Sequence, residues 1–387
     1  MNNWPRVPLG RLVSQIARTE VVTPDGEYRL LGVRLEGNGA FHRETVRGTE
    51  TSASRLSRVE TGDYIYSRLF AWRGAFGLIE SDLDGSFVSN EFPLFRVDEA
   101  RLDARYLNRW FQLPATWRRV EEDCTGSTPT TRNRFKEEFF LKLELPLPPL
   151  AEQQAIVARL DAMADKTRQL TAHLDAIEAD ADQLLAQQFQ AAIADAPYRP
   201  MSEVAPLVRR QAVIQPEASY PELGIRSFGK GAFHKPAVPG MELGNKRLFR
   251  IATGDLLFSN VFAWEGAIAI AGPADAGRFG SHRFMTCVVD EGLVLSNFLL
   301  YYLLAPEGLE KVREASPGGA GRNRTLGVEK LARLKVPVPP LAVQQAFVDL
   351  QSTVSALKSR HAATRADNAA LLPATLDRLF AGQRRTG

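Results

Sequence analysis

Apolar side chains recur most regularly over residues 150–194, at alternating steps of four and three from Ile156. This heptad spacing places them on one face, so we expect a helix about 65 Å long that packs along another helix. A similar pattern begins at Phe347, but it becomes more polar and contains Pro373, where we expect a kink or an early end. The predicted seam residues are Ile156, Leu160, Met163, Leu170, Leu174, Ile177 and Leu184 in the first helix and Phe347, Leu350, Val354 and Leu357 in the second.

The charges of these two stretches favour pairing between them. Residues 150–195 hold three Lys or Arg against eight Asp or Glu, and residues 341–387 hold six against three. We expect the helices to run antiparallel, which would place the segment before each helix at an opposite end. Two alternatives stay open: parallel packing, and packing of each helix on its own domain.

The chain contains an internal repeat with an offset of about 192 residues, so two copies nearly fill its 387 residues. Gly-Ala-Phe-His at 39–42 recurs at 231–234, and PLPPLAEQQA from Pro146 recurs as PVPPLAVQQA from Pro337. Three further blocks recur in the same order: Thr-Gly-Asp at 61–63 and 253–255, Phe-Ala-Trp at 70–72 and 262–264, and Arg-Asn-Arg at 132–134 and 322–324.

Each copy is rich in Gly, Thr, Val and aromatic residues broken by turn signals, which predicts short strands, with helical patterns over 106–120 and 297–312. We therefore predict an α+β protein in which two pseudo-symmetric α/β domains are separated by two long antiparallel coiled-coil helices. The predicted boundaries are 1–145 for the first domain, 146–195 for the first helix with its proline-rich lead-in, 196–336 for the second domain and 337–387 for the second helix.

Composition and motifs exclude several classes of protein. No run of eighteen apolar residues and no signal-peptide pattern occurs, so we expect a cytoplasmic protein. The two cysteines, Cys124 and Cys287, are too few for a disulfide framework or a zinc site. We find no phosphate loop, nucleophile elbow or metal motif, and we predict neither catalytic residues nor a metal site. His42 and His234 are equivalent by the repeat, and we interpret them as hydrogen-bonded structural histidines rather than bases.

Basic residues gather around the Gly-Ala-Phe-His block in both copies. Residues 226–250 hold six basic side chains and one acidic one, and residues 29–73 hold eight and five. Such surfaces attract DNA phosphates, although a solvated arginine-rich face is an equal alternative on charge alone.

Taken together, these features resemble the specificity subunits of type I restriction-modification systems, the HsdS family. The resemblance covers essentially the whole chain. It is carried by the segments 146–155 and 337–346 ahead of two long helices, by the Arg-Asn-Arg loops, and by the Gly-Asp and Phe-Ala-Trp blocks.

The resemblance implies that each domain is a target recognition domain reading one half of an asymmetric bipartite DNA sequence, and that the helices set the gap. It also implies a non-catalytic subunit that binds two methyltransferase subunits and is joined by motor-nuclease subunits for restriction. S-adenosylmethionine, ATP and magnesium would be bound by those partners, so we expect no cofactor and no membrane contact here.

Readout residues should occupy the same framework yet differ between the copies, because the two half-sites differ. Arginine suits guanine, asparagine suits adenine and glutamate suits the cytosine amino group. Ordinary surface drift is the alternative for any one pair. The candidates are Arg68 and Asn260, Arg73 and Glu265, Asn90 and His282, and Glu91 and Arg283.

Basic residues shared by the copies are better candidates for phosphates, which carry no sequence information. Their loops could instead contact the methyltransferase or cap the next helix. We interpret Phe70, Trp72, Phe262 and Trp264 as core packing rather than base stacking. The phosphate candidates are Arg43, Arg132, Arg134, Lys235, Arg322 and Arg324, together with Lys230, which has no basic residue opposite it in the first copy.

Two other functions stay open at this point. The chain could be a self-contained DNA-processing enzyme with an unrecognised active site, which would have to cut or methylate DNA alone. It could also be a coiled-coil scaffold that gathers proteins without reading DNA.

Overall fold

The computed structural model describes residues 4–124, 134–318 and 324–381. The chain divides into two compact units, and each takes part of both long helices. Unit 1 is Met1–Leu174 with Ala362–Gly387, and unit 2 is Asp175–His361. This division cuts across the domain boundaries expected from the sequence, which stay a prediction.

Unit 1 is built on two sheets. The first has the strand order β2-β10-β7-β8, the second β3-β6-β9-β4-β5, and β1 pairs antiparallel with β11. The strands are β1 (Arg6–Pro8), β2 (Val13–Ile16), β3 (Thr19–Val21), β4 (Glu27–Val33), β5 (Ala40–Arg47), β6 (Arg55–Arg58), β7 (Asp63–Tyr66), β8 (Phe76–Leu78), β9 (Phe87–Val88), β10 (Leu94–Val97) and β11 (Glu144–Pro146).

In the described ranges of unit 1, three short helices cover the core. The single helix expected over 106–120 is replaced by two, because Pro114 begins a new helix at its first position. These helices are α1 (Ala104–Trp110), α2 (Pro114–Glu122) and α3 (Glu137–Lys142), with short 3-10 turns η1 (Leu9–Arg11), η2 (Gly48–Glu50), η3 (Ala71–Arg73) and η4 (Ser81–Leu83).

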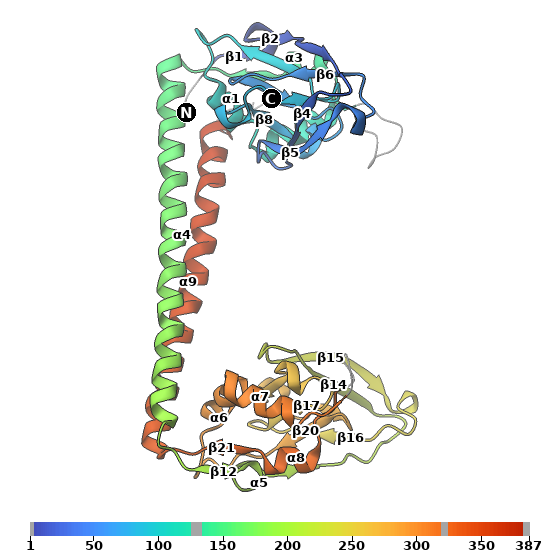
Figure 1. The fold of residues 1–387 in the computed structure, drawn as a ribbon, viewed down its shortest axis with the longest axis vertical. Coiled ribbons are helices and arrows are strands. Elements are labelled where there is room, and N and C mark those ends of the chain that lie inside the picture. The colour runs from blue at the N-terminus through green and yellow to red at the C-terminus, as the bar shows by residue number, and fades with distance from the viewer. Residues whose placement is uncertain (1–3, 125–133, 319–323, 382–387) are drawn as a thin grey trace. The chain divides into compact units, whose positions relative to one another are not determined.

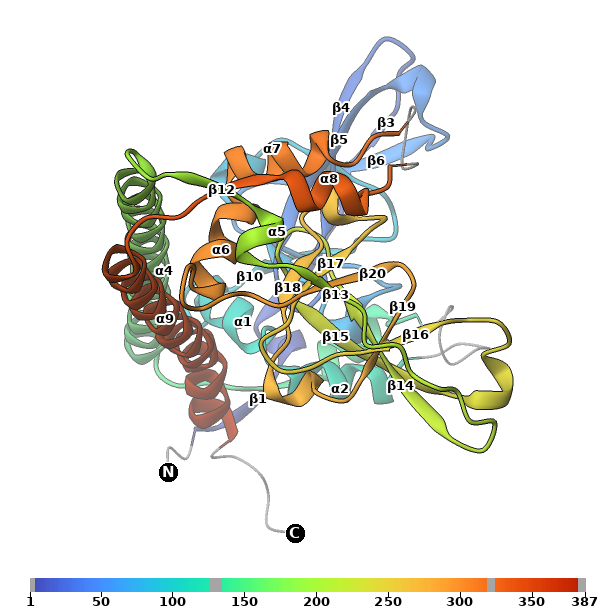
Figure 2. The same ribbon diagram turned by 90° about the horizontal axis from the view of Figure 1, so that it is seen from below.

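Unit 2 repeats this plan. Its sheets have the orders β13-β20-β17-β18 and β15-β14-β19-β16, and β12 pairs with β21. Figure 2 shows the β14–β15 hairpin extending beyond the rest of the unit. The strands are β12 (Tyr198–Pro200), β13 (Leu207–Val208), β14 (Ser219–Ile225), β15 (Ala232–Pro239), β16 (Leu248–Arg250), β17 (Leu256–Ser259), β18 (Ile268–Ile270), β19 (Phe279–Ser281), β20 (Phe284–Cys287) and β21 (Lys335–Pro337).

The helices of unit 2 match those of unit 1 in order, with a short extra helix after β12. The expected helix over 297–312 is again two helices, and Pro306 begins the second. They are α5 (Met201–Val204), α6 (Ser296–Leu304), α7 (Pro306–Glu314) and α8 (Val328–Arg333), with 3-10 turns η5 (Gly240–Glu242), η6 (Ala263–Glu265) and η7 (Pro273–Asp275).

The two long helices are α4 (Leu150–Ile193) and α9 (Leu341–Ala381), drawn in green and red in Figure 1. Within unit 2, His361 contacts Glu178 and Lys358 contacts Asp182, so the helices run antiparallel there. Within unit 1, the Asn368 side chain donates to the Thr167 carbonyl over 3.3 Å. The mixed fold with two long paired helices confirms the predicted fold class.

The predicted seam of α4 needs one correction. Leu160 and Leu174 are buried, but Leu170, Ile177 and Leu184 are about 40% exposed. The neighbour of Leu184 is turned inward instead, with Leu185 only 6% exposed. Adjacent residues on a helix lie about 100° apart, so one edge of the seam was assigned to the wrong neighbour.

The other predicted seam residues lie in or beside the helix contact. Phe347 and Val354 are buried, and Ile156, Met163, Leu350 and Leu357 are half-buried. The helix α9 does not end at Pro373 but continues to Ala381. Beyond the proline, Leu376 and Phe380 are buried in unit 1, and the Phe380 ring lies 5.5 Å from that of Tyr106. This burial accounts for the continuation.

The repeated Pro-x-Pro-Pro-Leu-x-x-Gln-Gln segment joins each long helix to its globular part through a fully buried glutamine. In unit 1 the Gln153 amide donates to the carbonyls of Arg101 and Pro148 and accepts from the Asp103 amide. In unit 2, Gln344 makes the same three kinds of bond, with Leu293, Pro339 and Leu295. A buried amide must be satisfied in this way, so each helix start is fixed to its unit.

No helix in the described ranges combines the length and apolarity that crossing a membrane requires.

Candidate nucleic-acid interface

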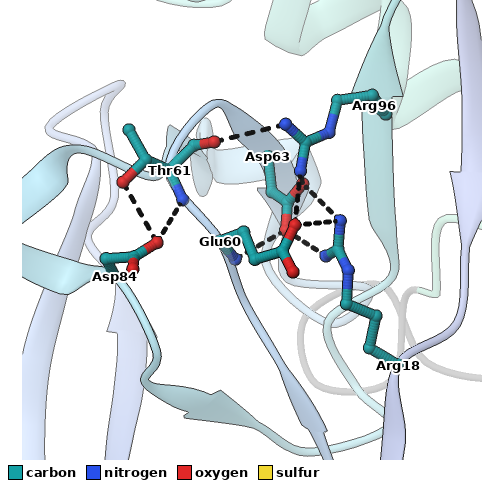
Figure 3. A network of polar contacts seen from close by, with 6 residues as sticks. All are labelled: Arg18, Glu60, Thr61, Asp63, Asp84 and Arg96. Carbon is teal, nitrogen blue, oxygen red and sulfur yellow. Dashed lines mark hydrogen bonds and ion pairs between the residues drawn. The ribbon is translucent and has the colours of Figure 1, made fainter.

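A buried aspartate after each Thr-Gly pair organises the first sheet of each unit. In unit 1 Asp63 is fully buried and pairs with Arg18 over 2.6 Å and Arg96 over 2.7 Å, while the Glu60 amide donates to it (Figure 3). In unit 2 Asp255 pairs with Arg210 over 2.6 Å. The hydrogen bond to Asp63 raises the pKa of Arg18. The repeated block is therefore structural, because a buried carboxylate requires such partners.

The turn beside Asp63 is held by a second carboxylate. Asp84 accepts from the backbone amide of Thr61 over 2.7 Å and from its hydroxyl over 3.1 Å, as Figure 3 shows. The backbone bond lowers the pKa of Asp84. Arg96 also donates to the Thr61 carbonyl. These contacts fix the turn that leads into β7 and so into the candidate residues that follow it.

The structure brings four unit 1 candidates together, and they bond to one another or to Glu137. They are Arg68, Asn90, Glu91 and Arg134. Arg68 donates through Nε to Glu137 over 3.0 Å and also contacts the Asn90 carbonyl. Glu91 forms an ion pair with Arg134. Burial opposes ionisation of Glu137, but the Arg68 hydrogen bond, the backbone and nearby arginines outweigh it and lower its pKa. A base could reach Arg68 only by displacing this carboxylate.

The equivalent place in unit 2 has a different polar set. The backbone of Asn260 bonds to Arg283 and to Leu326, and its side-chain Oδ1 is buried without a partner in the described part of the chain. His282 and Arg283 are exposed, and the Arg324 guanidinium lies 5.3 Å from the Trp264 ring centroid. Within the described residues this set has no counterpart to the Arg68–Glu137 ion pair, so it offers more open polar groups.

The remaining candidates are placed separately. Arg73 is exposed beside the Trp72 ring, whereas Glu265 accepts a hydrogen bond from the Ser227 hydroxyl. Arg43 is exposed and pairs with its neighbour Glu44. Lys230 and Lys235 are exposed near the rings of Phe228 and Phe233. Arg132 and Arg322 lie outside the described residues.

The paired histidines and the cysteines have ordinary structural surroundings. His42 shares a 2.9 Å contact with the Thr45 hydroxyl, and His234 one of 2.9 Å with Asp275. Burial raises the pKa of Cys124 to about 11 and that of Cys287 to about 12, so both thiols stay protonated at neutral pH.

Two phenylalanines interpreted as core residues are in fact at the surface. Phe70 is 46% exposed and Phe262 38% exposed, each directly before a 3-10 turn, η3 or η6. The core at these turns is formed by the following alanines, Ala71 and Ala263, which are fully buried. The indole nitrogens of Trp72 and Trp264 donate to nearby carbonyls, and both rings are half-buried.

The candidates from the sequence omit one pair of arginines that the structure makes prominent. Arg34 follows β4 and Arg226 follows β14, and each guanidinium lies over a phenylalanine of the next strand, 4.4 Å from the Phe41 ring centroid and 4.8 Å from that of Phe233. The two arginines are identical at the repeat offset of 192. That identity is the sequence signal that could have found them.

Comparison with known proteins bears on this geometry. Residues 46–179 match the family model described as the type I restriction modification DNA specificity domain. The matched stretch runs from the end of β5 through β6–β11 into α4, and the sheet β13-β20-β17-β18 of unit 2 repeats the strand order of the sheet β2-β10-β7-β8 of unit 1.

Solved structures extend the likeness to the whole chain at the level of the fold. The HsdS subunit of Thermoanaerobacter tengcongensis matches with a TM-score of 0.65 and 19% identity, over 99% of this chain and 98% of that one. A chain from a structure on complex assembly and conformational transition of the type I R-M system matches with a TM-score of 0.68 and 19% identity, over 97% of both chains. None of the curated proteins matches in sequence. The likeness to a specificity subunit expected from the sequence therefore holds at the level of the fold.

Proposed function

We propose that the chain is the DNA specificity subunit of a type I restriction-modification system. The observation that carries this proposal is the specificity-domain match of residues 46–179, together with a second unit whose first sheet repeats the same strand order. The self-contained enzyme and the protein scaffold are not favoured by these findings.

Each unit would read one half of a split DNA target. Their sheets and buried aspartate clamps are alike, but their exposed polar groups differ: Arg68 is paired with Glu137 in unit 1, and Arg283 and His282 are open in unit 2. Different groups on one framework present different donors and acceptors to base edges. The two half-sites should therefore differ in sequence.

The long helices would set the gap between the half-sites. They pair antiparallel within unit 2, and the buried glutamines Gln153 and Gln344 fix the start of each helix to its own globular part. A fixed helical connection converts helix length into the number of base pairs between the halves, as dimer geometry does for repressors.

The reaction itself would belong to other chains. We propose two methyltransferase subunits as partners, which bind S-adenosylmethionine and methylate adenine, and motor-nuclease subunits that use ATP and magnesium for restriction. The chain would then contribute DNA recognition and positioning and no catalytic residue.

The test is a map of methylated adenines in a genome that carries the system, with and without the gene for this chain. We expect methylation at one asymmetric bipartite sequence with a constant gap, which disappears when the gene is deleted. Methylation that persists unchanged after deletion would refute the proposal.

A further inference from the structure

Each unit carries a three-layer stack of glycine, phenylalanine and arginine at the turn of its longest hairpin. Gly32 on β4 is the register partner of Phe41 on β5, and Gly224 on β14 is that of Phe233 on β15. The ring covers the glycine so closely that a Cβ there would lie 2.8 Å from the Phe41 ring and 2.3 Å from the Phe233 ring. Only glycine permits this approach, so the ring is held in place.

The arginine forms the outer layer of the stack. Its guanidinium lies over the ring at 4.4 Å in unit 1 and 4.8 Å in unit 2, a distance typical of a cation–π contact. The turn below it is tied to η3, since the backbone amides of Glu36 and Gly37 donate to the carbonyls of Arg73 and Gly74. Phe228 and Gly229 make the same bonds in unit 2.

The charge of both arginines is uncompensated within the described residues. Arg34 and Arg226 are exposed, and neither pairs with a carboxylate of the described ranges, whereas Arg18 and Arg68 are both in ion pairs. Arg226 donates one hydrogen bond to the Ala232 carbonyl over 3.1 Å. A planar cation that is oriented beforehand and lacks a counter-charge suits an anionic oxygen.

We infer that the two stacks, Arg34 on Phe41 and Arg226 on Phe233, are phosphodiester-binding sites that hold the DNA backbone at the same place in each unit. This inference rests on the proposed function. A phosphate is favoured over a base because the stack is identical in both units, and a base contact would impose the same base on both halves.

The surroundings predict that the unit 2 site is the stronger of the two. Lys235 lies on β15 with its ammonium 5.9 Å from the Phe233 ring centroid. The equivalent residue in unit 1, Arg43, is paired with Glu44. Unit 2 therefore adds a second cation beside its stack, which would increase the attraction for a phosphate.

The test measures binding of the full chain, alone and with its methyltransferase partners, to duplex DNA at several salt concentrations. We expect Arg34→Gln and Arg226→Gln each to reduce the slope of log affinity against log salt by about 0.9, the value for one lost phosphate contact. Arg226→Gln should lose more affinity for DNA than Arg34→Gln. For each variant the loss of affinity should be the same on every DNA sequence. Arg168→Gln on α4, whose arginine is exposed and pairs with Asp165, is the matched control and should leave the slope unchanged.

Phenylalanine variants test the stack itself. Phe41→Leu and Phe233→Leu keep the charge but remove the ring, and we expect a weaker affinity with the salt slope of the wild type. A melting temperature measured for each variant separates this effect from loss of the fold. Affinity equal to that of the wild type in both folded variants would overturn the role of the ring.

The ways in which the test can fail are distinguishable. Wild-type chain that binds no DNA, even with its partners, would overturn the proposed function and this inference together. Normal wild-type binding with an unchanged slope in the Arg34→Gln, Arg226→Gln double variant would overturn this inference alone. Loss confined to one base sequence would instead assign the arginines to base readout, and loss of partner assembly with normal DNA binding would assign them to a protein interface.

Discussion

The two units share a framework, but different side chains occupy the equivalent place beside the 3-10 turns η3 and η6. In unit 1 the Trp117 indole donates to the Phe111 carbonyl over 2.6 Å and lies against Gly74, where a Cβ would be 2.4 Å from its ring. The equivalent residue in unit 2 is Leu309, and here the structure has a groove of about 910 Å³ that is also lined by Phe228 and Leu304. The backbone hydrogen bonds between the hairpin turn and the 3-10 turn are the same in both units. The side chain that packs there can therefore differ while the framework stays the same.

The attachment of the short helices to α4 differs in the same way. In unit 1, Arg109 on α1 forms an ion pair with Asp161. In unit 2 the equivalent Tyr301 packs its ring 4.7 Å from that of Phe189 and 4.8 Å from that of Phe347. One contact depends on charge and the other on apolar burial, so at this helix the repeat preserves the position of the contact but not its chemistry.

The largest difference we predict concerns the buried aspartates. Asp63→Asn removes the buried charge that pairs with both Arg18 and Arg96 and leaves them only the half-exposed carboxylate of Glu60, so we expect unit 1 to lose about 3 kcal/mol of stability. Asp255→Asn leaves one arginine, Arg210, and should cost less. Urea unfolding gives the loss, and hydrogen exchange shows which unit carries it. Equal losses of stability for Asp63→Asn and Asp255→Asn would contradict the predicted difference between the units.

The contacts between the long helices also differ between the units, and here we expect smaller losses of stability. Leu185→Ala removes a buried side chain from the apolar seam of unit 2, and we expect a loss of about 2–3 kcal/mol. In unit 1, Asn368→Ala removes only the two hydrogen bonds between its side chain and Thr167 and should cost about 1 kcal/mol. The neighbour Leu184→Ala is the control for both, because Leu184 is 43% exposed and its loss should be within about 0.5 kcal/mol. A Leu184→Ala loss as large as that of Leu185→Ala would restore the seam predicted from the sequence.

Exchanging Trp117 and its equivalent Leu309 tests whether the side chain at this place can change without loss of the framework. Trp117→Leu should destabilise unit 1 by about 2 kcal/mol, since it opens space against Gly74. Leu309→Trp should change the stability of unit 2 by less than about 1 kcal/mol, because the groove has room for the ring. Thermal unfolding measures both, and a large loss for Leu309→Trp would show that unit 2 requires its open groove.

The smallest effect depends on pH. The folded structure lowers the pKa of Glu137, so its ion pair with Arg68 stabilises unit 1 fully above the ordinary glutamate pKa of 4.5 and progressively less as the pH falls through the folded value. Solvent keeps the contribution below about 1 kcal/mol. Glu137→Gln should therefore destabilise the protein at pH 7 and have little effect at pH 3. An equal effect at both pH values would exclude the ion pair as the cause.

The sequence predicted the duplicated fold because the repeat is carried by residues with structural duties. Gln153 bonds three backbone groups, and Asp63 holds two arginines, so neither can change without loss of the framework. The seam was predicted less well because Leu184 and Leu185 are adjacent and both apolar, and only the partner helix decides which one is buried.

The candidate site was harder to predict, for a different reason. Arg68 looked like a free readout residue, but its partner Glu137 is 69 positions away in the sequence, and spacing does not reveal such a pair. Differences between the copies drew attention to variable residues. The constant pair Arg34 and Arg226 was visible in the same alignment, and only the rings of Phe41 and Phe233 beneath them show why they are held in place.

The central claim is that each unit reads its own half of the target on a shared framework. The most direct test replaces residues 198–337, from β12 to β21, with a second copy of residues 6–146, from β1 to β11, and maps the adenines methylated in cells that carry the chimera. A melting curve of the purified chimera shows that it folds. We predict a symmetric target in which the half read by unit 1 occurs twice in inverted order. A folded chimera that still directs methylation to the original asymmetric sequence would contradict the account.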